Sequence, residues 1–356
     1  MKGIDFKGLR IGPGLPTFII AEAGVNHNGS IDLALQLVDA AAEAGADAVK
    51  FQTFVTEELI TRHSPKAEYH IATTGTDQSQ SWFALLKSEE LSAADFARVK
   101  ARCEERRIVF MSTPYDEPSV DLLDRLDVVA YKIASTDSNN LPFLEYVASK
   151  RRPVILSTGM CTMDEVRESV AALRRGGCEQ LVLMHCTAEY PAPLEEANLR
   201  AMTTMSRELD VPVGYSDHVP SLSAALASVA LGSCVYEKHF TLDRSLPGPD
   251  HRASVEPAEL KDLVQAMRAV EAALGDGVKR VMPSEAANRP LLRKSVVAKR
   301  DIGAGERLGR NNLAIKRAGG QGMPPGAYYA LIGRTARATI PAETPISEPL
   351  LAPRTP

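Results

Sequence analysis

The sequence lacks the features that identify several classes of protein. Its formal net charge is only -4 over 356 residues, which argues against nucleic acid as the main partner. No run approaches the roughly 20 consecutive apolar residues that a membrane span needs. The lysines within residues 1–14 are not followed by the apolar stretch of a secretory signal. We therefore expect a cytoplasmic protein with neither a nucleic acid nor a membrane partner.

Cysteine is scarce, and its pattern excludes a disulfide framework or a Cys-x-x-Cys site. The five cysteines are odd in number, and several lie in apolar runs, which fits reduced thiols in a cytosolic protein. A cysteine nucleophile stays open but has no local signature. A glycine-rich GxGxxG turn is also missing after the first predicted strand, which disfavours a doubly wound nucleotide-binding sheet.

What the sequence does contain is a regular succession of short apolar runs. Eight of them predict strands, at residues 18–24, 48–53, 108–112, 128–135, 153–159, 181–187, 211–219 and 235–240. Helical spacing separates most of these runs, and residues 260–274 follow the last one with the same spacing. Eight strands alternating with helices over roughly 260 residues predict an α/β fold of the closed (β/α)8 TIM-barrel type. A doubly wound open sheet is the alternative.

The alternation stops near Gly275, which divides the chain. We predict a catalytic barrel at residues 1–276, a linker rich in Gly, Pro and charge at 277–291, and a small irregular domain at 292–356. Within the barrel, the connection 54–91 loses all periodicity and holds His63, His70, Gly75 and Trp82. A connection of this length is usually a functional loop or lid.

The carboxyl ends of barrel strands face one opening, where active sites are built. Two predicted strands carry a histidine at that end, His218 and His239. Two imidazoles there could hold a divalent metal with positions left for water and substrate. Buried histidines satisfied by backbone carbonyls are the alternative. Asp217 and Glu237 flank the pair and could orient it, although Asp217 also fits an ordinary helix cap.

Two lysines, Lys50 and Lys132, interrupt apolar runs next to hydroxyl residues. Such a set suits a phosphate or carboxylate ligand, while structural ion pairs are the alternative. Glu22 is either a satisfied buried acid or a general acid/base. Lys238 should point away from its neighbours in a regular strand, so we interpret it as structural. The other polar residues at these strand ends are Asn26, His27, Asn28, Gln52, Ser112, Thr113, Ser135, Asp137, Ser157, Thr158, His185, Thr187, Tyr190 and Ser216.

The order of these motifs resembles one known family. They are AEAGVNHNG (21–29), KFQTF (50–54), STP (112–114), YKIAS (131–135), ILSTGM (155–160), HCTAEYPAP (185–193), GYSDH (214–218), EKHFTLD (237–243), GPDH (248–251) and KRAGGQG (316–322), with GAGE and PAETPISEPL in the tail. The chain is similar throughout to the sialic acid synthase family, which makes nonulosonic acids from phosphoenolpyruvate and an N-acetylated hexosamine. The resemblance implies a barrel and an antifreeze-like (SAF) domain, swapped in a homodimer so that each small domain caps the other barrel.

The resemblance also implies roles for particular residues. His218 and His239 match the metal ligands, usually for manganese or magnesium, and Arg317 matches an arginine reaching in from the partner's small domain. The phosphoenolpyruvate contacts would be Lys50, Lys132, Thr113, Ser135, Ser157 and Ser216. The sugar side or the acid/base work would fall to Glu22, Gln52, Tyr190 and Asp250, with Glu22 the candidate for proton transfer.

Three departures from the family pattern bear on the substrate. Ala188 replaces an Asn that often contacts phosphoenolpyruvate, and Ala318 replaces a Pro in the turn that presents Arg317. Asp137 stands where some members have Glu, so the reach toward the sugar could differ. The wording AEYPAP, with PKAEY at 65–69, resembles bacterial neuraminic and legionaminic acid synthases more than pseudaminic ones.

The activity expected from the resemblance is that of an N-acetylneuraminate synthase, a transferase. It would condense phosphoenolpyruvate with N-acetylmannosamine with C–O cleavage, giving sialic acid and phosphate. The alternative is a legionaminic acid synthase using 2,4-diacetamido-2,4,6-trideoxymannose. A Schiff-base aldolase using Lys50 or Lys132 is a less favoured enzyme. A carbohydrate- or ice-binding protein with an inactive barrel is the non-enzymatic alternative, but it has no need of five intact chemical residues at one mouth.

Overall fold

The computed structural model describes residues 3–66, 71 and 81–353. Its contacts divide the chain into two compact units, Met1–Gly275 and Asp276–Pro356. The residues predicted as a linker, 277–291, group with the second unit and carry two short helices, α12 (Pro283–Ala286) and α13 (Asn288–Leu292). In the described part of the chain, no helix has both the length and the apolar character needed to cross a membrane.

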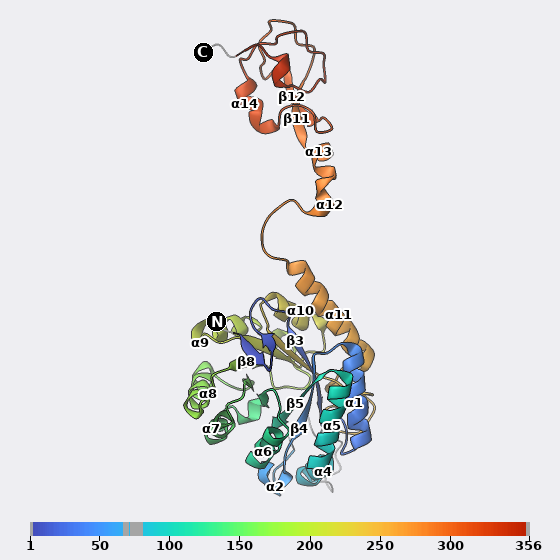
Figure 1. Cartoon of the computed structure of the whole chain (residues 1–356), viewed down its shortest axis with the longest axis vertical. Coiled ribbons are helices and arrows are strands. Elements are labelled where there is room, and N and C mark those ends of the chain that lie inside the picture. The colour runs from blue at the N-terminus through green and yellow to red at the C-terminus, as the bar shows by residue number, and fades with distance from the viewer. Residues whose placement is uncertain (1–2, 67–70, 72–80, 354–356) are drawn as a thin grey trace. The chain divides into compact units, whose positions relative to one another are not determined.

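Eight parallel strands of the first unit form the barrel (Figure 1). They are β3 (Phe18–Gly24), β4 (Ala48–Thr53), β5 (Val109–Pro114), β6 (Tyr131–Ile133), β7 (Val154–Ser157), β8 (Leu181–Cys186), β9 (Val213–Asp217) and β10 (Val235–His239). The hydrogen-bonded order is β5-β4-β3-β10-β9-β8-β7-β6, and the two end strands, β5 and β6, lie against each other. The sheet is therefore nearly closed, and the predicted (β/α)8 architecture is confirmed.

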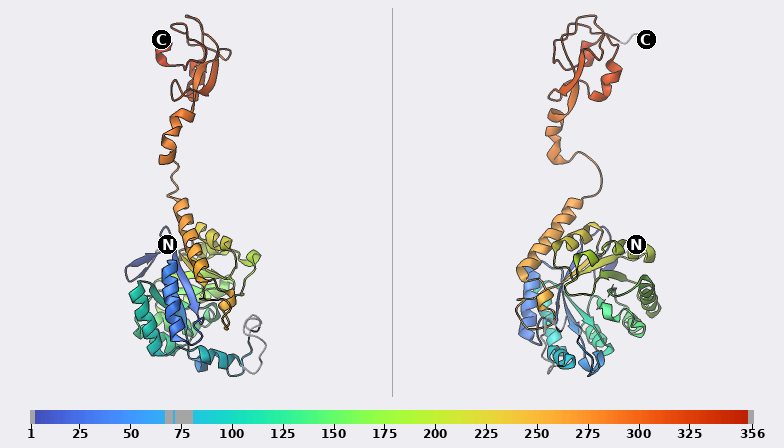
Figure 2. Two further views of the ribbon diagram at one scale, coloured as in Figure 1. Left: turned by 90° about the vertical axis from the view of Figure 1, so that its right-hand side faces the viewer. Right: turned by 180° about the vertical axis from the view of Figure 1, so that it is seen from behind.

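An outer ring of helices covers the barrel, as the two further views in Figure 2 also show. The ring consists of α1 (Ile31–Ala44), α5 (Ala93–Arg106), α6 (Glu117–Arg125), α7 (Leu141–Ser149), α8 (Met163–Gly176), α9 (Arg200–Leu209), α10 (Leu222–Ala230) and α11 (Pro257–Leu274). Ser30 caps α1 by accepting from the Leu33 amide, and Gly45 ends it at φ 84°. The sequence pattern did not predict α6 or α9. These helices bury few apolar side chains, Val120 and Leu123 in α6 and Met202 and Met205 in α9, so they show little helical spacing.

The amino end of the barrel is closed by a hairpin that the sequence pattern missed. Its strands, β1 (Ile4–Phe6) and β2 (Leu9–Ile11), are too short to show an alternating pattern. Lys7 and Gly8 both have positive φ, 52° and 100°, as the tight turn between them requires. Ile4, Phe6 and Ile11 pack on inward-facing apolar residues of the barrel strands. The interior at this end is therefore apolar, which leaves polar chemistry to the carboxyl end.

Among its described residues, the long connection after β4 contains the helices α2 (Thr56–Leu59) and α4 (Trp82–Glu89). Val25, Phe54 and Leu86 form a small apolar cluster there, with Trp82 and Tyr115 partly buried against it. His70, Gly75 and most of the PKAEY segment lie outside the described residues. The interpretation of this connection as a functional loop or lid stays a prediction.

The second unit is a small β-rich domain. Its strands β11 (Lys294–Ala298) and β12 (Leu313–Arg317) pair antiparallel, and it contains α14 (Tyr328–Leu331) and the 3-10 turns η4 (Pro325–Ala327) and η5 (Glu348–Leu350). Its own apolar core includes Val296, Ile302, Leu308, Leu313 and Ile340. The remaining 3-10 turns, in the first unit, are η1 (Ser135–Asp137), η2 (Leu194–Glu196) and η3 (His251–Ala253).

Candidate active site

Four charged side chains meet inside the carboxyl end of the barrel. The ammonium of Lys50 lies 2.6 Å from Glu22 Oε2 and 3.7 Å from Glu237 Oε2, and Lys132 lies 3.4 Å from Glu237 Oε1. All four residues are at most 4% exposed. Alternation along each strand explains the convergence, because Ile20, two residues before Glu22, and Val235, two before Glu237, face the barrel interior. The site is a buried cluster of two cations and two anions.

Hydroxyl groups complete this cluster. Lys50 donates to Thr113 Oγ1 at 2.8 Å, and Lys132 donates to Ser157 Oγ at 2.7 Å. Ser216 Oγ donates to Glu237 Oε1 at 3.2 Å. Ser135 Oγ lies beside them and accepts from the Gly159 amide at 2.9 Å. Ammonium groups with adjacent hydroxyls are the donors that a phosphate or carboxylate ligand needs.

The two buried carboxyls differ in acidity. Burial raises the pKa of Glu22 to about 7, and the nearby Glu237 charge adds to the rise although Lys50 opposes it. Burial alone would also raise the pKa of Glu237, but the ammonium groups of Lys132 and Lys50 lower it to about 2. Two carboxyls with separated pKa values in one site can divide acid/base work between them, because one stays ionised while the other exchanges a proton near neutral pH.

The two lysines differ as well. Burial would lower the pKa of Lys50, yet the carboxylates of Glu22 and Glu237 raise it. Burial lowers the pKa of Lys132, only partly offset by Glu237. Lys50 is therefore firmly an ammonium, while Lys132 is the lysine of the pair that is easier to deprotonate.

The two histidines lie side by side above this cluster. The ring centroids of His218 and His239 are 5.5 Å apart, and the Tyr190 ring covers them at 4.1 and 5.5 Å. His218 Nδ1 donates to the Thr187 carbonyl at 2.7 Å, which leaves its Nε2 as the free lone pair. His239 Nδ1 is buried without a hydrogen-bond partner. Burial lowers the pKa of His218 to about 4 and lowers that of His239 well below its usual value.

These features fit a divalent metal. Neutral imidazoles are the ligand form, and a backbone carbonyl on the second nitrogen is the usual support for a metal-bound histidine. Two imidazoles bound to one ion at about 2.1 Å hold their centroids about 5 Å apart, which the observed spacing matches. No group of three or more His, Cys, Asp or Glu in the described residues could hold a metal. An ion at His218 and His239 would therefore keep most of its positions for water and substrate.

A third group of polar residues converges over the bare Cα of Gly24. Gln52 Nε2 donates to Glu22 Oε1 at 3.4 Å, and Asp250 Oδ2 lies 3.7 Å from His239 Nδ1. A Cβ built on Gly24 would meet Gln52 Nε2 at 3.3 Å, Asp250 Oδ2 at 3.5 Å and Glu22 Oε1 at 3.5 Å. Gly24 has φ 53° and follows a register shift in β3 that breaks the regular strand. Burial raises the pKa of Asp250 to about 6, with Lys50 opposing it.

We expect Gly24→Ala to lower kcat/KM by about tenfold to a hundredfold, because the methyl group would press on all three polar side chains and strain the backbone. Gly232→Ala is the matched control, since that glycine also has positive φ, 89°, but has open space around it. Both variants should lose similar stability in thermal unfolding. An equal loss of kcat/KM in the two variants would contradict a role for the space above Gly24.

Several polar residues at the strand ends face the helices and not the mouth of the barrel. Asp217 accepts from the Tyr236 hydroxyl at 2.6 Å and the Val219 amide at 2.9 Å, so the interpretation that it orients a histidine is wrong. Lys238 donates to the Val219 carbonyl and lies 3.4 Å from Asp217, pointing away from the site as strand alternation predicts. His185 binds the Ala197 carbonyl through Nε2 at 2.8 Å.

Other polar candidates hold the mouth loops together. Asn26 donates to the Phe240 carbonyl at 2.9 Å, and Asn28 Oδ1 accepts from His251 Nε2 at 3.1 Å. His27 Nδ1 accepts from the Gly29 amide at 3.1 Å. These contacts tie the loop after β3 to the loop after β10. The hydroxyls of Ser112 and Thr158 are buried against Thr53 and the Met184 carbonyl, so they do not reach the charged cluster.

The three positions that depart from the family pattern, Asp137, Ala188 and Ala318, lie in different parts of the chain. Asp137 is partly buried in η1 and accepts from Asn140, and burial raises its pKa. Ala188 lies beside Gly159, whose built Cβ would meet the Ala188 Cβ at 3.1 Å. Arg317 is exposed at the end of β12 and has no carboxylate partner in the described residues, and Ala318 follows it half-buried.

Sequence reasoning missed two buried groups near the site. Cys186 Sγ lies 3.7 Å from His218 Nδ1, and burial raises the pKa of this thiol to about 11, so it is a neutral neighbour. The only sequence signal was its position two residues after Met184, which faces the interior. Glu89, at the end of α4, is 4% exposed, and burial raises its pKa to about 8, with Asp250 adding to the rise. Nothing in the sequence links it to the barrel mouth.

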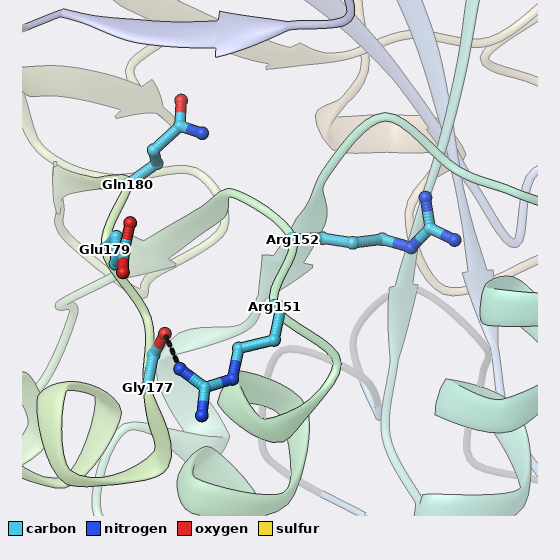
Figure 3. Close-up of a pocket in the computed structure, with 5 residues that line it drawn as sticks. All are labelled: Arg151, Arg152, Gly177, Glu179 and Gln180. Carbon is cyan, nitrogen blue, oxygen red and sulfur yellow. Dashed lines mark hydrogen bonds between the residues drawn. The ribbon is translucent and has the colours of Figure 1, made fainter.

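A separate surface pocket lies at the opposite end of the barrel (Figure 3). Arg151, Arg152, Gly177, Glu179 and Gln180 line it, and they precede β7 and β8 rather than follow them. Arg152 is neutralised by Asp124 and Asp127, and Arg151 binds the Gly177 carbonyl at 3.4 Å. This pocket is therefore remote from the charged cluster.

Comparisons with known proteins agree with this geometry. The NeuB family model matches residues 37–279, and the SAF domain model matches residues 293–352. The N,N'-diacetyllegionaminic acid synthase of Campylobacter jejuni is 44% identical over 90% of this chain and 96% of that protein. The synthase of the same name from Legionella pneumophila is 42% identical over 94% of both chains.

A solved structure and more distant relatives extend the comparison. The crystal structure of an N-acetylneuraminic acid synthetase from Leptospira borgpetersenii, in complex with citrate, has a TM-score of 0.69 at 34% identity. It covers 81% of this chain and 95% of that one. The human N-acetylneuraminate-9-phosphate synthase is 36% identical over 97% of this chain and 95% of that protein. The chain is a (β/α)8 barrel followed by a SAF domain, and these relatives match it along nearly its whole length. It therefore belongs to the NeuB family of nonulosonic acid synthases.

Proposed function

We propose that this protein is a legionaminic acid synthase, which condenses phosphoenolpyruvate with 2,4-diacetamido-2,4,6-trideoxymannose and releases phosphate. The expectation of N-acetylmannosamine as first choice is revised. Relatives named for diacetyllegionaminic acid are 44% and 42% identical, whereas those named for N-acetylneuraminate 9-phosphate are 37% and 36% identical. N-acetylmannosamine stays the second candidate because the Leptospira structure is named as a sialic acid synthetase.

The observation that carries the proposal is the buried cluster of Lys50, Lys132, Glu22 and Glu237 beneath two neutral imidazoles. Lys50 and Lys132, with Thr113 and Ser157, would bind the phosphate and carboxylate of phosphoenolpyruvate by charge-assisted hydrogen bonds. Ser135 and Ser216 add hydroxyls on the same side. Binding energy from these groups would hold carbon 3 against the sugar aldehyde, which converts an encounter of two molecules into a reaction within one complex.

His218 and His239 would hold a divalent manganese or magnesium ion, which when bound supplies Lewis-acid polarisation of the sugar aldehyde. Tyr190 covers both imidazoles and limits the access of water. Gln52 and Asp250 stand on the sugar side of the cluster. Glu22 contacts Lys50 through one carboxylate oxygen and Gln52 through the other. Burial raises its pKa to about 7, which makes it the candidate for proton transfer.

The bonds change in the following order in this scheme. Carbon 3 of phosphoenolpyruvate attacks the aldehyde carbon, which leaves cationic character at carbon 2. Water adds at carbon 2, and the tetrahedral intermediate collapses by breaking the C–O bond to phosphate. Glu237, which stays ionised, faces the developing cation together with the two lysines that hold the anionic groups. No lysine needs to form a covalent adduct.

The reaction predicts a definite fate for isotopic label. Phosphoenolpyruvate carrying oxygen-18 in the bridging position should deliver that label to phosphate, measured by mass spectrometry. In a phosphate-release screen with manganese and magnesium, the diacetamido-trideoxy sugar should give a kcat/KM at least about tenfold above that for N-acetylmannosamine. Label retained in the sugar acid would exclude C–O cleavage. The opposite order of the two sugars would return N-acetylmannosamine to first place.

The homodimer in which each small domain completes the other barrel is part of this proposal. Five apolar side chains of the connecting segment, Val278, Val281, Met282, Leu291 and Leu292, are at least 40% exposed, which suits a segment that another chain covers. Arg317 is exposed and has no carboxylate partner among residues 3–66, 71 and 81–353, as a residue that acts in a second copy would be.

We predict that two inactive variants will complement each other. Arg317→Ala removes the arginine of one small domain, and His239→Ala disables one barrel. Mixed dimers from coexpression should regain roughly a quarter of the activity, because one pairing of small domain and barrel is intact in each hetero-dimer and about half of the dimers are mixed. Mixing Arg317→Ala with Arg317→Lys as a control should give only the average of the two. Failure of the first mixture, with hetero-dimers confirmed by mass, would argue against completion of the site by a second copy.

A further inference from the structure

The proposed reaction leaves one buried carboxyl at the barrel mouth without a role. Glu89, the last residue of α4, is 4% exposed, and its Oε2 has no hydrogen-bond partner in the described part of the chain. The next residue shows how a structural carboxylate is satisfied here, since Glu90 accepts from the Thr56 amide at 2.6 Å and pairs with Lys87 at 2.9 Å. A buried carboxyl without a partner costs stability, so Glu89 calls for a partner that arrives with a ligand.

Close packing of α4 on the loop after β3 fixes the position of Glu89. A Cβ built on Gly29 would lie 2.2 Å from the Ser88 carbonyl oxygen and 3.7 Å from Glu89 Cα, so only a glycine permits this approach. Leu86, three residues before Glu89, packs in the same apolar cluster as Val25. The loop after β3 is in turn hydrogen-bonded to the loop after β10. Glu89 therefore lies where three loops of the barrel mouth meet.

Asp250 lies between Glu89 and the charged cluster. Asp250 Oδ2 is 3.7 Å from His239 Nδ1, and the Lys50 ammonium lowers the pKa of Asp250. Among the described residues, Asp250 is the only charge that shifts the pKa of Glu89, so Glu89 is more remote from Lys50 than Asp250 is. In the proposed reaction the sugar aldehyde is held at the histidines. Substituents on the later carbons of the open-chain sugar would therefore extend past Asp250 toward Glu89.

The Glu89 carboxyl is suited to donate a hydrogen bond. Burial raises its pKa to about 8, and the negative charge of Asp250 adds to the rise. A protonated carboxyl carries an O–H group, which can donate to a carbonyl oxygen. An acetamido substituent places a carbonyl oxygen farther from the sugar chain than a hydroxyl group reaches. The two candidate sugars differ in this respect at carbon 4, which carries an acetamido group in the diacetamido-trideoxy sugar and a hydroxyl in N-acetylmannosamine.

We propose that Glu89 contacts the substrate: it donates a hydrogen bond to the carbonyl of the acetamido group at carbon 4 and thereby favours the diacetamido sugar over N-acetylmannosamine. This inference rests on the proposed function for the identity of the sugar, and it adds a residue that selects that sugar. A site discriminates against a substrate that leaves its buried polar group unpaired. The Glu89 carboxyl has no partner before the sugar binds, so the hydrogen bond is gained only with the sugar that supplies the carbonyl.

Two replacements of Glu89 in the full-length protein test this contact. Glu89→Met keeps the length of the side chain but cannot donate, so kcat/KM for the diacetamido sugar should fall by about tenfold to a hundredfold, and that for N-acetylmannosamine by at most about threefold. Glu89→Gln keeps a neutral donor of the same shape and should stay within about threefold of the native chain for both sugars. The affinity for phosphoenolpyruvate, measured by calorimetry without sugar, should be unchanged in both variants.

Thermal unfolding of the substrate-free protein separates this role from a structural one. Glu89→Met removes a buried polar group that has no partner, so its melting temperature should equal or exceed that of the native chain. Glu90→Met is the matched control on the neighbouring residue, because it removes the acceptor of the Thr56 amide. This control should lower the melting temperature and keep the native preference between the two sugars.

Three outcomes would overturn the role of Glu89. The first is a Glu89→Met chain whose kcat/KM is native, or is lowered equally, for the two sugars. The second is a loss in Glu89→Gln as large as that in Glu89→Met. The third is a lower melting temperature of Glu89→Met, which would reveal a structural partner. The native preference between the sugars tests the proposed function separately, and the melting temperatures need no substrate, so they stand even when neither sugar is turned over.

Discussion

Replacing His239 with alanine should abolish turnover and manganese binding together. In the structure His239 offers a buried ring nitrogen with no hydrogen-bond partner, next to His218, whose Nδ1 is fixed on the Thr187 carbonyl. Polarisation of an aldehyde by a divalent ion contributes several kcal/mol, so its loss should lower kcat by about 10³-fold or more. Chelation of the native enzyme should have the same effect, and added manganese should reverse it.

The matched control lies on β8, which is separated from β10 by β9 in the barrel. His185 is at the same end of β8 but faces the helices and binds the Ala197 carbonyl. His185→Gln should therefore lose some stability but bind one manganese per barrel, measured by electron paramagnetic resonance in the absence of substrate. Binding of manganese by His239→Ala with native affinity, or full native activity after chelation, would remove the metal from the scheme.

The contrast between these two histidines shows how far the sequence alone could lead. The run LVLMHCT is apolar on both faces, since β8 is buried by the interior on one side and by helices on the other. Alternation therefore states that His185 and Cys186 point in opposite directions but does not state which one points inward. The inward direction of Lys50 and Lys132 was easier to predict. Burying a lysine inside an apolar run costs too much free energy unless its ammonium joins a polar cluster.

Strand alternation could not predict the residues that approach the site from outside the barrel strands. Glu89 reaches the vicinity of Asp250 because α4, at the far end of a long connection, packs on the loop after β3, where Leu86 contacts Val25. The hairpin of β1 and β2 could not be predicted, because strands of three residues are too short to show alternating hydrophobicity. Neither interpretation of Asp217 is correct. Ser221 is the cap of α10, and the Asp217 carboxylate accepts from the Val219 amide and the Tyr236 hydroxyl on the helix-facing side of the strand, away from the histidines.

The second large effect concerns the lysines that would bind phosphoenolpyruvate. Lys132→Met should lower kcat/KM for phosphoenolpyruvate by about 10³-fold, because it removes a charge-assisted bond and leaves Glu237 with one cation fewer in a buried site. Breaking a buried ion pair on one side costs about 3–5 kcal/mol, so a fall in thermal stability is expected as well. Lys50→Met should behave similarly, with Glu22 as the carboxylate left unpaired.

Lys238→Met separates substrate binding from stability. Lys238 lies between Glu237 and His239 in the chain, is equally buried and is paired with Asp217, but it faces the helix layer. Its removal should cost similar stability while the folded protein keeps its affinity for phosphoenolpyruvate, measured by calorimetry. A native affinity in Lys132→Met would show that this lysine does not hold the substrate anion.

Lys132 also distinguishes the two reactions considered for this barrel, Schiff-base aldolase chemistry and direct condensation. Burial lowers the pKa of Lys132, which is the property a Schiff-base lysine needs. Its Nζ, however, donates to Ser157 and lies 3.4 Å from Glu237, so it is held as a donor to an anion rather than presented as a free amine. Borohydride treatment of the enzyme with phosphoenolpyruvate and sugar should therefore give no increase in protein mass. A borohydride-dependent adduct on Lys132 that Lys132→Met abolishes would establish the aldolase route and remove the direct condensation.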